Sequence, residues 1–215
     1  MKIFIDSTDP AEIREALRIG CADGVTTNPS LLAKAGVDLE RTIRAIAEIV
    51  TGPVNAEVTS LTADAIIEEG RRFIRWGSNV HVKIPLNHEG LIACKALASE
   101  GIRSTLTLVF SPTQAIMAAQ AGAAWICPFV GRLDDIASDG MDLIRTIQEI
   151  YNHDPDWETQ ILVASVRHPV HVIEAARAGA DAVTVPYSVL QQMERHPLTD
   201  RGIAQFLEDA KKAQR

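Results

Sequence analysis

The segment Asn79-Val80-His81-Val82-Lys83-Ile84-Pro85 predicts a short buried strand that ends at its proline, because proline lacks the amide hydrogen that would continue a sheet. Side chains alternate along a strand, so the apolar residues share one face while His81 and Lys83 share the other. An ammonium group on a buried strand is unfavourable unless it is paired, and burial lowers its pKa. Two interpretations follow. The lysine is either a reactive amine of the kind that adds to carbonyls, or a structural lysine whose head reaches water or a carboxylate.

The surroundings of this strand repeat along the chain. A helix, a glycine and a short β-rich strand recur, and two copies are close in sequence: Ala118-Ala119-Gln120-Ala121-Gly122-Ala123 and Ala175-Ala176-Arg177-Ala178-Gly179-Ala180. Besides the Lys83 strand, we expect strands at 2–5, 24–27, 54–58, 105–110, 125–129, 161–166 and 182–185. Eight apolar strands alternating with helices predict parallel pairing and an α/β fold of the (β/α)8 TIM-barrel type.

An open doubly wound sheet is the alternative, but no Gly-x-Gly-x-x-Gly follows the first strand. No linker or low-complexity segment interrupts the chain, so we expect a single barrel domain over residues 1–215. An extra amphipathic C-terminal helix is expected at about 199–213, with Ile203, Phe206 and Leu207 on one side. Its apolar side would cover either its own barrel or a neighbouring subunit.

Bulk composition argues against several classes of partner. The 215 residues are 47% hydrophobic and 23% charged, with a net charge of −7, which disfavours nucleic acid and anionic membranes as partners. Cys21, Cys94 and Cys127 form no Cys-x-x-Cys motif, so neither a disulfide framework nor a zinc site is expected. The early charges at Lys2 and Asp6 do not fit a signal peptide, and no apolar run is long enough to span a membrane. We therefore expect a cytoplasmic protein.

Polar residues gather where the predicted strands end, which is where such barrels carry their active sites. Strand alternation places Thr105 and Thr107 on the interior face, opposite Leu106 and Leu108. A single polar residue at a strand end is usually a cap, but so many around one lysine favour a functional site. The ring comprises Asp6, Thr26, Asn28, Glu57, Lys83, Thr105, Thr107, Phe129, Arg132, Ser165 and Arg167.

These residue types suit one reaction. A lysine amine condenses with a ketone to an iminium, which accepts the electron pair of a neighbouring carbon–carbon bond as that bond breaks. Glu57 and Thr107, bridged by a water molecule, would shuttle the protons of this condensation. Asp6 would act as the base for the hydroxyl that becomes an aldehyde.

The remaining ring members suit a phosphorylated sugar. Asn28 is able to hold sugar hydroxyls, and Arg132, Arg167 and Ser165 offer the donors that a phosphate monoester accepts. No metal ligand set is evident. His168 and His171 are three residues apart, but without a third ligand nearby a surface helix is the favoured interpretation. His81 is expected below Lys83 as a hydrogen-bonded core residue.

Several segments together resemble the transaldolase family, over essentially the whole chain. They are Asp6-Ser7-Thr8, Gly24-Val25-Thr26-Thr27-Asn28-Pro29-Ser30, Val82-Lys83-Ile84-Pro85, Thr107-Leu108-Val109-Phe110, Pro128-Phe129-Val130-Gly131-Arg132 and Ala164-Ser165-Val166-Arg167. The similarity is greatest to the short-chain branch, which also holds the fructose-6-phosphate aldolases. It implies that Lys83 is the Schiff-base lysine, Asp6 the cleavage base, and Glu57 with Thr107 the water-holding pair.

The resemblance also implies an activity and an assembly. A dihydroxyacetone unit would pass from sedoheptulose 7-phosphate or fructose 6-phosphate to erythrose 4-phosphate or glyceraldehyde 3-phosphate, as in the pentose phosphate pathway. No metal or organic cofactor would be needed, and the subunits would form a homo-oligomer, a pentamer or decamer. The rival functions are an aldolase that releases free dihydroxyacetone and a barrel that only binds sugar phosphates.

Four positions bear on that choice. Glu57 and Phe129 match transaldolases, whereas the aldolases carry glutamine and tyrosine there. Thr105 stands where transaldolases commonly have asparagine, and Cys127 where they commonly have serine. Both are expected to touch the bound ketose, so both would influence donor preference.

Overall fold

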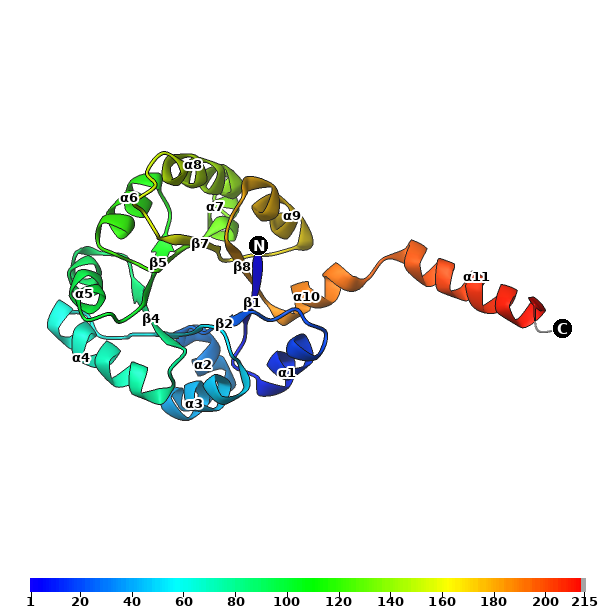
Figure 1. The fold of residues 1–215 in the computed structure, drawn as a ribbon, viewed down its shortest axis with the longest axis horizontal. Helices are drawn as coiled ribbons and strands as arrows, with labels where there is room; N and C mark the ends of the chain where they lie inside the picture. Colours follow the sequence, from blue (N-terminus) through cyan, green and yellow to red (C-terminus); the bar gives the residue numbers. More distant parts are fainter. Residues whose placement is uncertain (214–215) are drawn as a thin grey trace.

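The computed structural model describes residues 1–213 and forms a closed barrel of eight parallel strands, seen end-on in Figure 1. Each strand pairs with the next in sequence, and β8 pairs with β1 to close the sheet. The predicted (β/α)8 barrel is therefore confirmed. The strands are β1 (Lys2–Asp6), β2 (Gly24–Thr26), β3 (Val54–Glu57), β4 (Val80–Pro85), β5 (Ser104–Val109), β6 (Trp125–Pro128), β7 (Gln160–Val163) and β8 (Ala182–Val185).

Helices surround the strands on the outside of the barrel (Figure 1). Many begin at a side chain that accepts a hydrogen bond from the first turn, as at Asp9, whose carboxylate accepts from the Ala11 amide before α1. The helices are α1 (Pro10–Arg18), α2 (Pro29–Ala35), α3 (Leu39–Ile49), α4 (Ala63–Phe73), the 3₁₀ turn η1 (Ile74–Trp76), α5 (His88–Ser99), α6 (Pro112–Gln120), α7 (Val130–Asp134), α8 (Gly140–Asn152), α9 (Pro169–Ala178), α10 (Tyr187–Glu194) and α11 (Pro197–Ala213).

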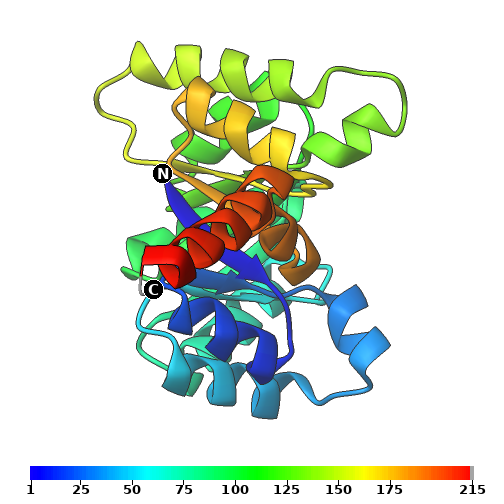
Figure 2. The same ribbon diagram turned by 90° about the vertical axis from the view of Figure 1, so that its right-hand side faces the viewer.

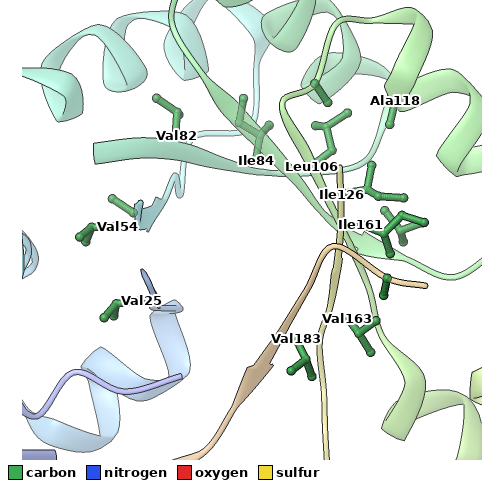
Figure 3. Close-up of a cluster of buried hydrophobic side chains, with 14 of the residues drawn as sticks. Val25, Val54, Val82, Ile84, Leu106, Ala118, Ile126, Ile161, Val163 and Val183 are labelled. Atoms are coloured by element: carbon green, nitrogen blue, oxygen red, sulfur yellow. The ribbon is translucent and has the colours of Figure 1, made fainter. Parts of the chain in front are cut away.

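The larger apolar core lies between the strands and the helices. Figure 3 shows β-branched and leucine side chains of the strands, among them Val54, Val82 and Ile84, beside the surrounding helices. These residues are almost wholly buried, and each such side chain contributes about 1.5–3 kcal/mol relative to exposure. The outward-facing side chains of the strands thus pack against the helices. The inward-facing side chains are not needed for that packing.

A second, smaller apolar cluster fills part of the barrel interior. Phe4 and Trp125 meet there with ring centroids 5.5 Å apart, packed with Leu162 and Ala182. Gly24 is required beside them, because an added Cβ would lie 2.8 Å from the Phe4 ring. This cluster fills the interior beneath the polar side chains at the carboxyl ends of the strands.

His81 differs from the sequence-based expectation. It is buried as predicted, but its Nδ1 has no hydrogen-bond partner within residues 1–213. Its register neighbour Asn55 is already engaged, donating to the Val25 carbonyl and accepting from Thr105. Burial and the positive charge of Arg103 lower the pKa of His81 to about 4, so the ring is neutral.

Strand alternation fails at one position near the site. The β5–β6 register shifts between Thr107 and Val109, and Leu108 adopts a left-handed φ of 60°. The bulge turns Leu108 toward the cavity at the strand ends, although alternation predicted that it faces away.

The C-terminal helix α11 extends away from the barrel in Figure 1, and in the rotated view of Figure 2 it points toward the viewer in front of the barrel. No described residue of α11 is buried, and Phe206 is 75% exposed. The sequence left open whether the apolar side of this helix covers its own barrel or a neighbouring subunit. Its exposure excludes packing against its own barrel. Within residues 1–213, no helix combines the length and the hydrophobicity that crossing a lipid bilayer requires.

Candidate active site

A cavity of about 500 Å³ opens at the carboxyl ends of the strands. It brings together most of the residues predicted from the sequence and leaves out two. Those lining it are Asp6, Thr26, Asn28, Glu57, Lys83, Cys127, Phe129, Arg132, Ser165 and Arg167, whereas Thr105 and Thr107 do not line it.

Lys83 lies on the interior side of β4, with its side chain only 4% exposed. Parallel pairing of β3 with β4 aligns Glu57 with Lys83, and the Lys83 Nζ lies 3.0 Å from the Glu57 Oε2. The same Nζ donates a hydrogen bond of 3.0 Å to the Thr27 carbonyl at the end of β2. The lysine head is thus held by two neighbouring strands.

The charge environment of Lys83 corrects one expectation. Burial acts to lower the pKa of Lys83, as the sequence suggested, but the nearby carboxylates of Glu57 and Asp6 outweigh it. The net result is a raised pKa, so the unliganded site holds an ammonium ion. A reaction that uses the free amine must first move this proton, and Glu57 is in hydrogen-bond contact to receive it.

Asp6 ends β1 on the same interior face. Thr26 donates a hydrogen bond of 2.7 Å to its Oδ1, and the Thr26 hydroxyl also lies 2.7 Å from that of Thr184. Burial raises the pKa of Asp6, while Lys83 and hydrogen bonds from Thr26 and Asn28 act in the opposite direction. Thr184 lines the cavity but was not among the predicted residues. Its alternation with Val183 and Val185 on β8 was a signal that could have identified it.

Thr105 and Thr107 lie beside the cavity rather than on its wall. Thr105 is fully buried and donates a hydrogen bond of 2.5 Å to the Asn55 side chain. The Thr107 hydroxyl is buried and has no partner within residues 1–213, so it is free to bind a water molecule or a substrate hydroxyl. Cys127 does reach the wall, and burial raises its pKa to about 12, so it is a neutral thiol.

The start of α2 forms another part of the wall. Asn28 caps this helix, its Oδ1 accepting from the Leu31 amide at 3.0 Å, and the amide nitrogen of its side chain is the group that donates to Asp6. Ser30 and Lys34 of α2 also line the cavity. These two were missed because they lie beyond the strand end, where alternation makes no prediction.

Two arginines, Arg132 and Arg167, line the wall of the cavity opposite α2. Arg132 lies on the short helix α7, with its guanidinium carbon 4.9 Å from the Phe129 ring centroid. Arg167 follows β7 and forms an exposed ion pair of 2.8 Å with Asp135. Ser165, between β7 and Arg167, has a left-handed φ of 60°. Both arginines line the cavity, so this wall suits an anionic group.

The histidine pair lies at the start of the surface helix α9 (Pro169–Ala178), as expected, but the two rings differ in exposure. His168 is exposed, but His171 is only 4% exposed and its Nε2 lies 2.8 Å from the Asp134 Oδ2. The sequence pattern missed the burial of His171 because its partner Asp134 belongs to α7 and precedes it by 37 residues. Across residues 1–213, no group of three or more His, Cys, Asp or Glu side chains is arranged to hold a metal ion.

Fold and site together define a (β/α)8-barrel enzyme that carries a buried lysine–carboxylate pair at the mouth of the barrel. Comparison with known sequences gives the family: residues 3–215 match the transaldolase/fructose-6-phosphate aldolase family, and the chain belongs to it. It is thus an enzyme of the transferase or aldolase type.

Curated relatives align over nearly the full chain. A probable transaldolase of Myxococcus xanthus is 58% identical over 99% of this chain and 95% of its own. A probable transaldolase of Sorangium cellulosum is 55% identical over 99% of this chain and 98% of its own. Among solved structures, a thiamine phosphate pyrophosphorylase from Pyrococcus furiosus superposes with a TM-score of 0.59 at 15% identity, covering 86% of this chain and 85% of its own. That likeness concerns the fold alone.

Proposed function

We propose that this enzyme transfers a dihydroxyacetone unit from a ketose phosphate to an aldose phosphate through a Schiff base on Lys83. The donors are sedoheptulose 7-phosphate and fructose 6-phosphate, and the acceptors are erythrose 4-phosphate and glyceraldehyde 3-phosphate. The observation that carries the proposal is the 3.0 Å contact between Lys83 and Glu57, in a cavity that Asp6 and the two arginines also line.

The reaction begins with the proton on Lys83. Glu57 accepts it, and the free amine attacks the C2 carbonyl of the ketose to form a carbinolamine. Glu57 then returns a proton to the departing hydroxyl through a water molecule held by Thr107, and water leaves to give the iminium. The unpaired Thr107 hydroxyl supports this role, because it has an acceptor and a donor to offer that water.

Asp6 serves the carbon–carbon cleavage. Its carboxylate takes the proton from the C4 hydroxyl, the C3–C4 bond breaks, and its electron pair moves into the iminium to form an enamine. The aldose phosphate leaves, and the enamine adds to the acceptor aldehyde by the reverse sequence. Asp6 is suited to the task because it is held by Thr26 on the same interior face as Lys83.

The side of the cavity that carries Arg132 and Arg167, the arginine wall, binds the phosphate group. Arg132 and Arg167 would donate charged hydrogen bonds, each contributing about 1.5–3 kcal/mol, with the Ser165 hydroxyl alongside. On the opposite side, Thr26 and Asn28 would contact the sugar hydroxyls. Cys127 would lie against the ketose, and Thr105 would act on it only through Asn55, since that is its hydrogen-bond partner.

The alternative within the family is an aldolase that releases free dihydroxyacetone. Phe129 favours the transferase, because its ring packs against Phe110, with centroids 5.8 Å apart, and carries no hydroxyl to protonate the enamine. The enamine therefore persists until an acceptor aldehyde arrives. A barrel that binds sugar phosphates without chemistry is disfavoured by the intact set of Asp6, Glu57, Lys83 and Thr107.

Borohydride reduction with fructose 6-phosphate tests the covalent step. We expect loss of activity and a mass increase on the peptide that contains Lys83. Labelling of a different lysine, or of none, contradicts the Schiff-base assignment. The matched control is Lys95→Arg on the outer helix α5, which should label as the wild type does.

Acceptor dependence tests transferase against aldolase. Erythrose 4-phosphate should strongly raise the flux from fructose 6-phosphate, which alone should turn over poorly. Phe129→Tyr should shift the balance toward release of dihydroxyacetone. If the wild type releases dihydroxyacetone without acceptor as fast as it transfers it, the aldolase is the correct function.

Assembly and location complete the proposal. The exposed apolar side of α11, with Ile203, Phe206 and Leu207, would cover a neighbouring subunit in a homo-oligomer, a pentamer or decamer. The substrates named here belong to cytoplasmic sugar metabolism, specifically the pentose phosphate pathway, so we place the enzyme in the cytoplasm.

A further inference from the structure

His171 forms a buried link behind the arginine wall. It lies in the first turn of α9, is 4% exposed, and does not line the cavity. Both nitrogens of its ring are engaged. Nδ1 accepts a hydrogen bond of 3.2 Å from the backbone N–H of Arg167, and Nε2 lies 2.8 Å from the Asp134 Oδ2. One imidazole therefore joins the turn that carries Arg167 to the end of the helix that carries Arg132.

Asp134 extends this link to a third helix. Its other oxygen, Oδ1, accepts from the Gly140 amide at 2.9 Å, at the start of α8. At the opposite end of α7, the amides of Val130 and Gly131 each donate a hydrogen bond of 3.1 Å to the segment just after β7, at the carbonyls of Ala164 and Ser165. The short helix α7 is thus held at both ends.

The two segments approach so closely that only glycine fits between them. A Cβ at Gly131 would lie 2.2 Å from the Ser165 carbonyl oxygen and 2.6 Å from the Arg167 Nε. The direction of the Arg167 side chain therefore depends on where α7 lies. Besides the exposed ion pair of Arg167 with Asp135, the link through His171 is a buried side-chain contact that keeps α7 in register with the Arg167 turn.

The hydrogen bonds also specify the form of the ring. Since Nδ1 accepts a hydrogen bond, the proton must be on Nε2, where it is donated to Asp134. Burial and the neighbouring His168 lower the pKa of His171, while Asp134 and Glu174 oppose them. A second proton on Nδ1 would oppose the Arg167 N–H with another donor and break that hydrogen bond.

We propose that His171, as a neutral imidazole protonated at Nε2, is a positioning residue that orients Arg132 and Arg167 for the phosphate of the substrate. This inference rests on the proposed phosphate role of the arginines. It adds a residue that touches neither the substrate nor the reacting atoms and acts through the backbone of Arg167 and through Asp134.

The test compares a phosphorylated with an unphosphorylated ligand. The KM for fructose 6-phosphate, with erythrose 4-phosphate as acceptor, depends on the arginine wall. Borohydride trapping of dihydroxyacetone on the lysine does not, because dihydroxyacetone has no phosphate. His171→Leu removes both hydrogen bonds at similar volume and should raise this KM about tenfold, with kcat and trapping within about twofold of wild type. His171→Asn restores an acceptor toward the Arg167 N–H and should recover part of the loss.

Two further variants keep the test decisive. Asp134→Ala breaks the same link at its partly exposed end and should also raise the KM for fructose 6-phosphate. It replaces His171→Leu in the test if that variant fails to fold. His168→Leu is the matched control, because that ring lies 3.9 Å from His171 between centroids but makes no capping hydrogen bond. It should leave the KM within about twofold of wild type.

The outcomes separate this inference from the proposed function. If Arg167→Leu leaves the KM for fructose 6-phosphate unchanged, the phosphate role itself is wrong. If Arg167→Leu raises it while His171→Leu and Asp134→Ala do not, only the inference on His171 is overturned. Equal losses in KM and in dihydroxyacetone trapping would mean a general structural role, and also overturn it. Nitrogen-15 NMR should show the Nε2–H tautomer of His171 at pH 7, and an Nδ1–H or charged ring would refute the positioning mechanism.

Discussion

Replacing Glu57 by glutamine tests how the site controls the proton on Lys83. The change keeps the shape of the side chain and removes one negative charge 3.0 Å from the Nζ. Coulomb's law at that separation, with an effective dielectric constant of about 20, gives an upper limit of about 5.5 kcal/mol. Because the cavity is open to water, a shift of about 1–3 pKa units is the expected size.

The variant should change two quantities in different ways. The apparent pKa of Lys83 should fall by about 1–3 units, since the ammonium ion loses its nearest carboxylate. The maximal rate of adduct formation should also fall, by about 10²–10⁴-fold, because the group that shuttles protons is gone. The remaining carboxylate of Asp6 limits the shift, as it also favours the charged amine.

The assay is the rate of borohydride trapping with dihydroxyacetone, followed from about pH 6 to about pH 11.5, so that the range extends above the ordinary lysine pKa of about 10.4. For the Glu57→Gln variant, the inflection should move to lower pH while the plateau drops. Glu68→Gln, on the exposed side of α4, removes an equal charge away from the cavity and should change neither. A lower plateau with an unmoved inflection would refute the argument that Glu57 holds the proton of Lys83.

Four further variants probe other parts of the molecule. Asp6→Asn should permit trapping of the Schiff base but slow turnover of fructose 6-phosphate at least about 10²-fold, because only cleavage needs this base. Asp135→Asn removes the ion-pair partner of Arg167 and should lower the KM for fructose 6-phosphate about two- to fivefold, the effect of an exposed pair. Gly24→Ala should destabilise the fold by about 1–3 kcal/mol in urea unfolding, because its Cβ would overlap the Phe4 ring. Deletion of residues 199–215 should reduce the particle size in sedimentation, because the apolar side of α11 would no longer be available to a neighbour.

Each of these has an outcome that contradicts it. If Asp6→Asn abolishes trapping together with cleavage, the division of roles between Asp6 and Glu57 is wrong. A raised KM in Asp135→Asn would mean that the carboxylate orients Arg167 instead of competing with the phosphate. Gly202→Ala, which meets no atom within 4 Å, is the control for Gly24→Ala, and equal destabilisation of both would refute the packing argument. An unchanged oligomer after the deletion would show that α11 takes no part in assembly.

Much of the barrel and of the cavity could be predicted because the relevant signals are local. The alternation of apolar residues, the recurring glycines and the capping residues each act within a few positions of the chain, so they specify strands and helices before any tertiary contact exists. Parallel pairing then follows from the alternating order, and it brings the strand ends together. That is why Lys83, Glu57 and Asp6 could be assigned to one ring from the residues alone, and the structure does gather them around one cavity.

The short helix α7 and the buried side of α9 were beyond such reasoning. Five residues show too little periodicity to predict α7, and the burial of His171 depends on Asp134 from that helix. Leu108 shows the same limit within a strand, because a one-residue register shift against β6 reversed the direction of its side chain.

The sequence by itself therefore determined the (β/α)8 architecture and the chemical types of side chain at its carboxyl end, because these depend on periodicity along the chain. Only the tertiary structure decided how those groups act on one another. The raised pKa of Lys83 arises from two carboxylates on other strands, although burial by itself would have lowered it. The separation of α11 from its own barrel is likewise a property of the folded chain. Electrostatic energies and burial depend on distances between residues far apart in sequence, and folding is what sets those distances.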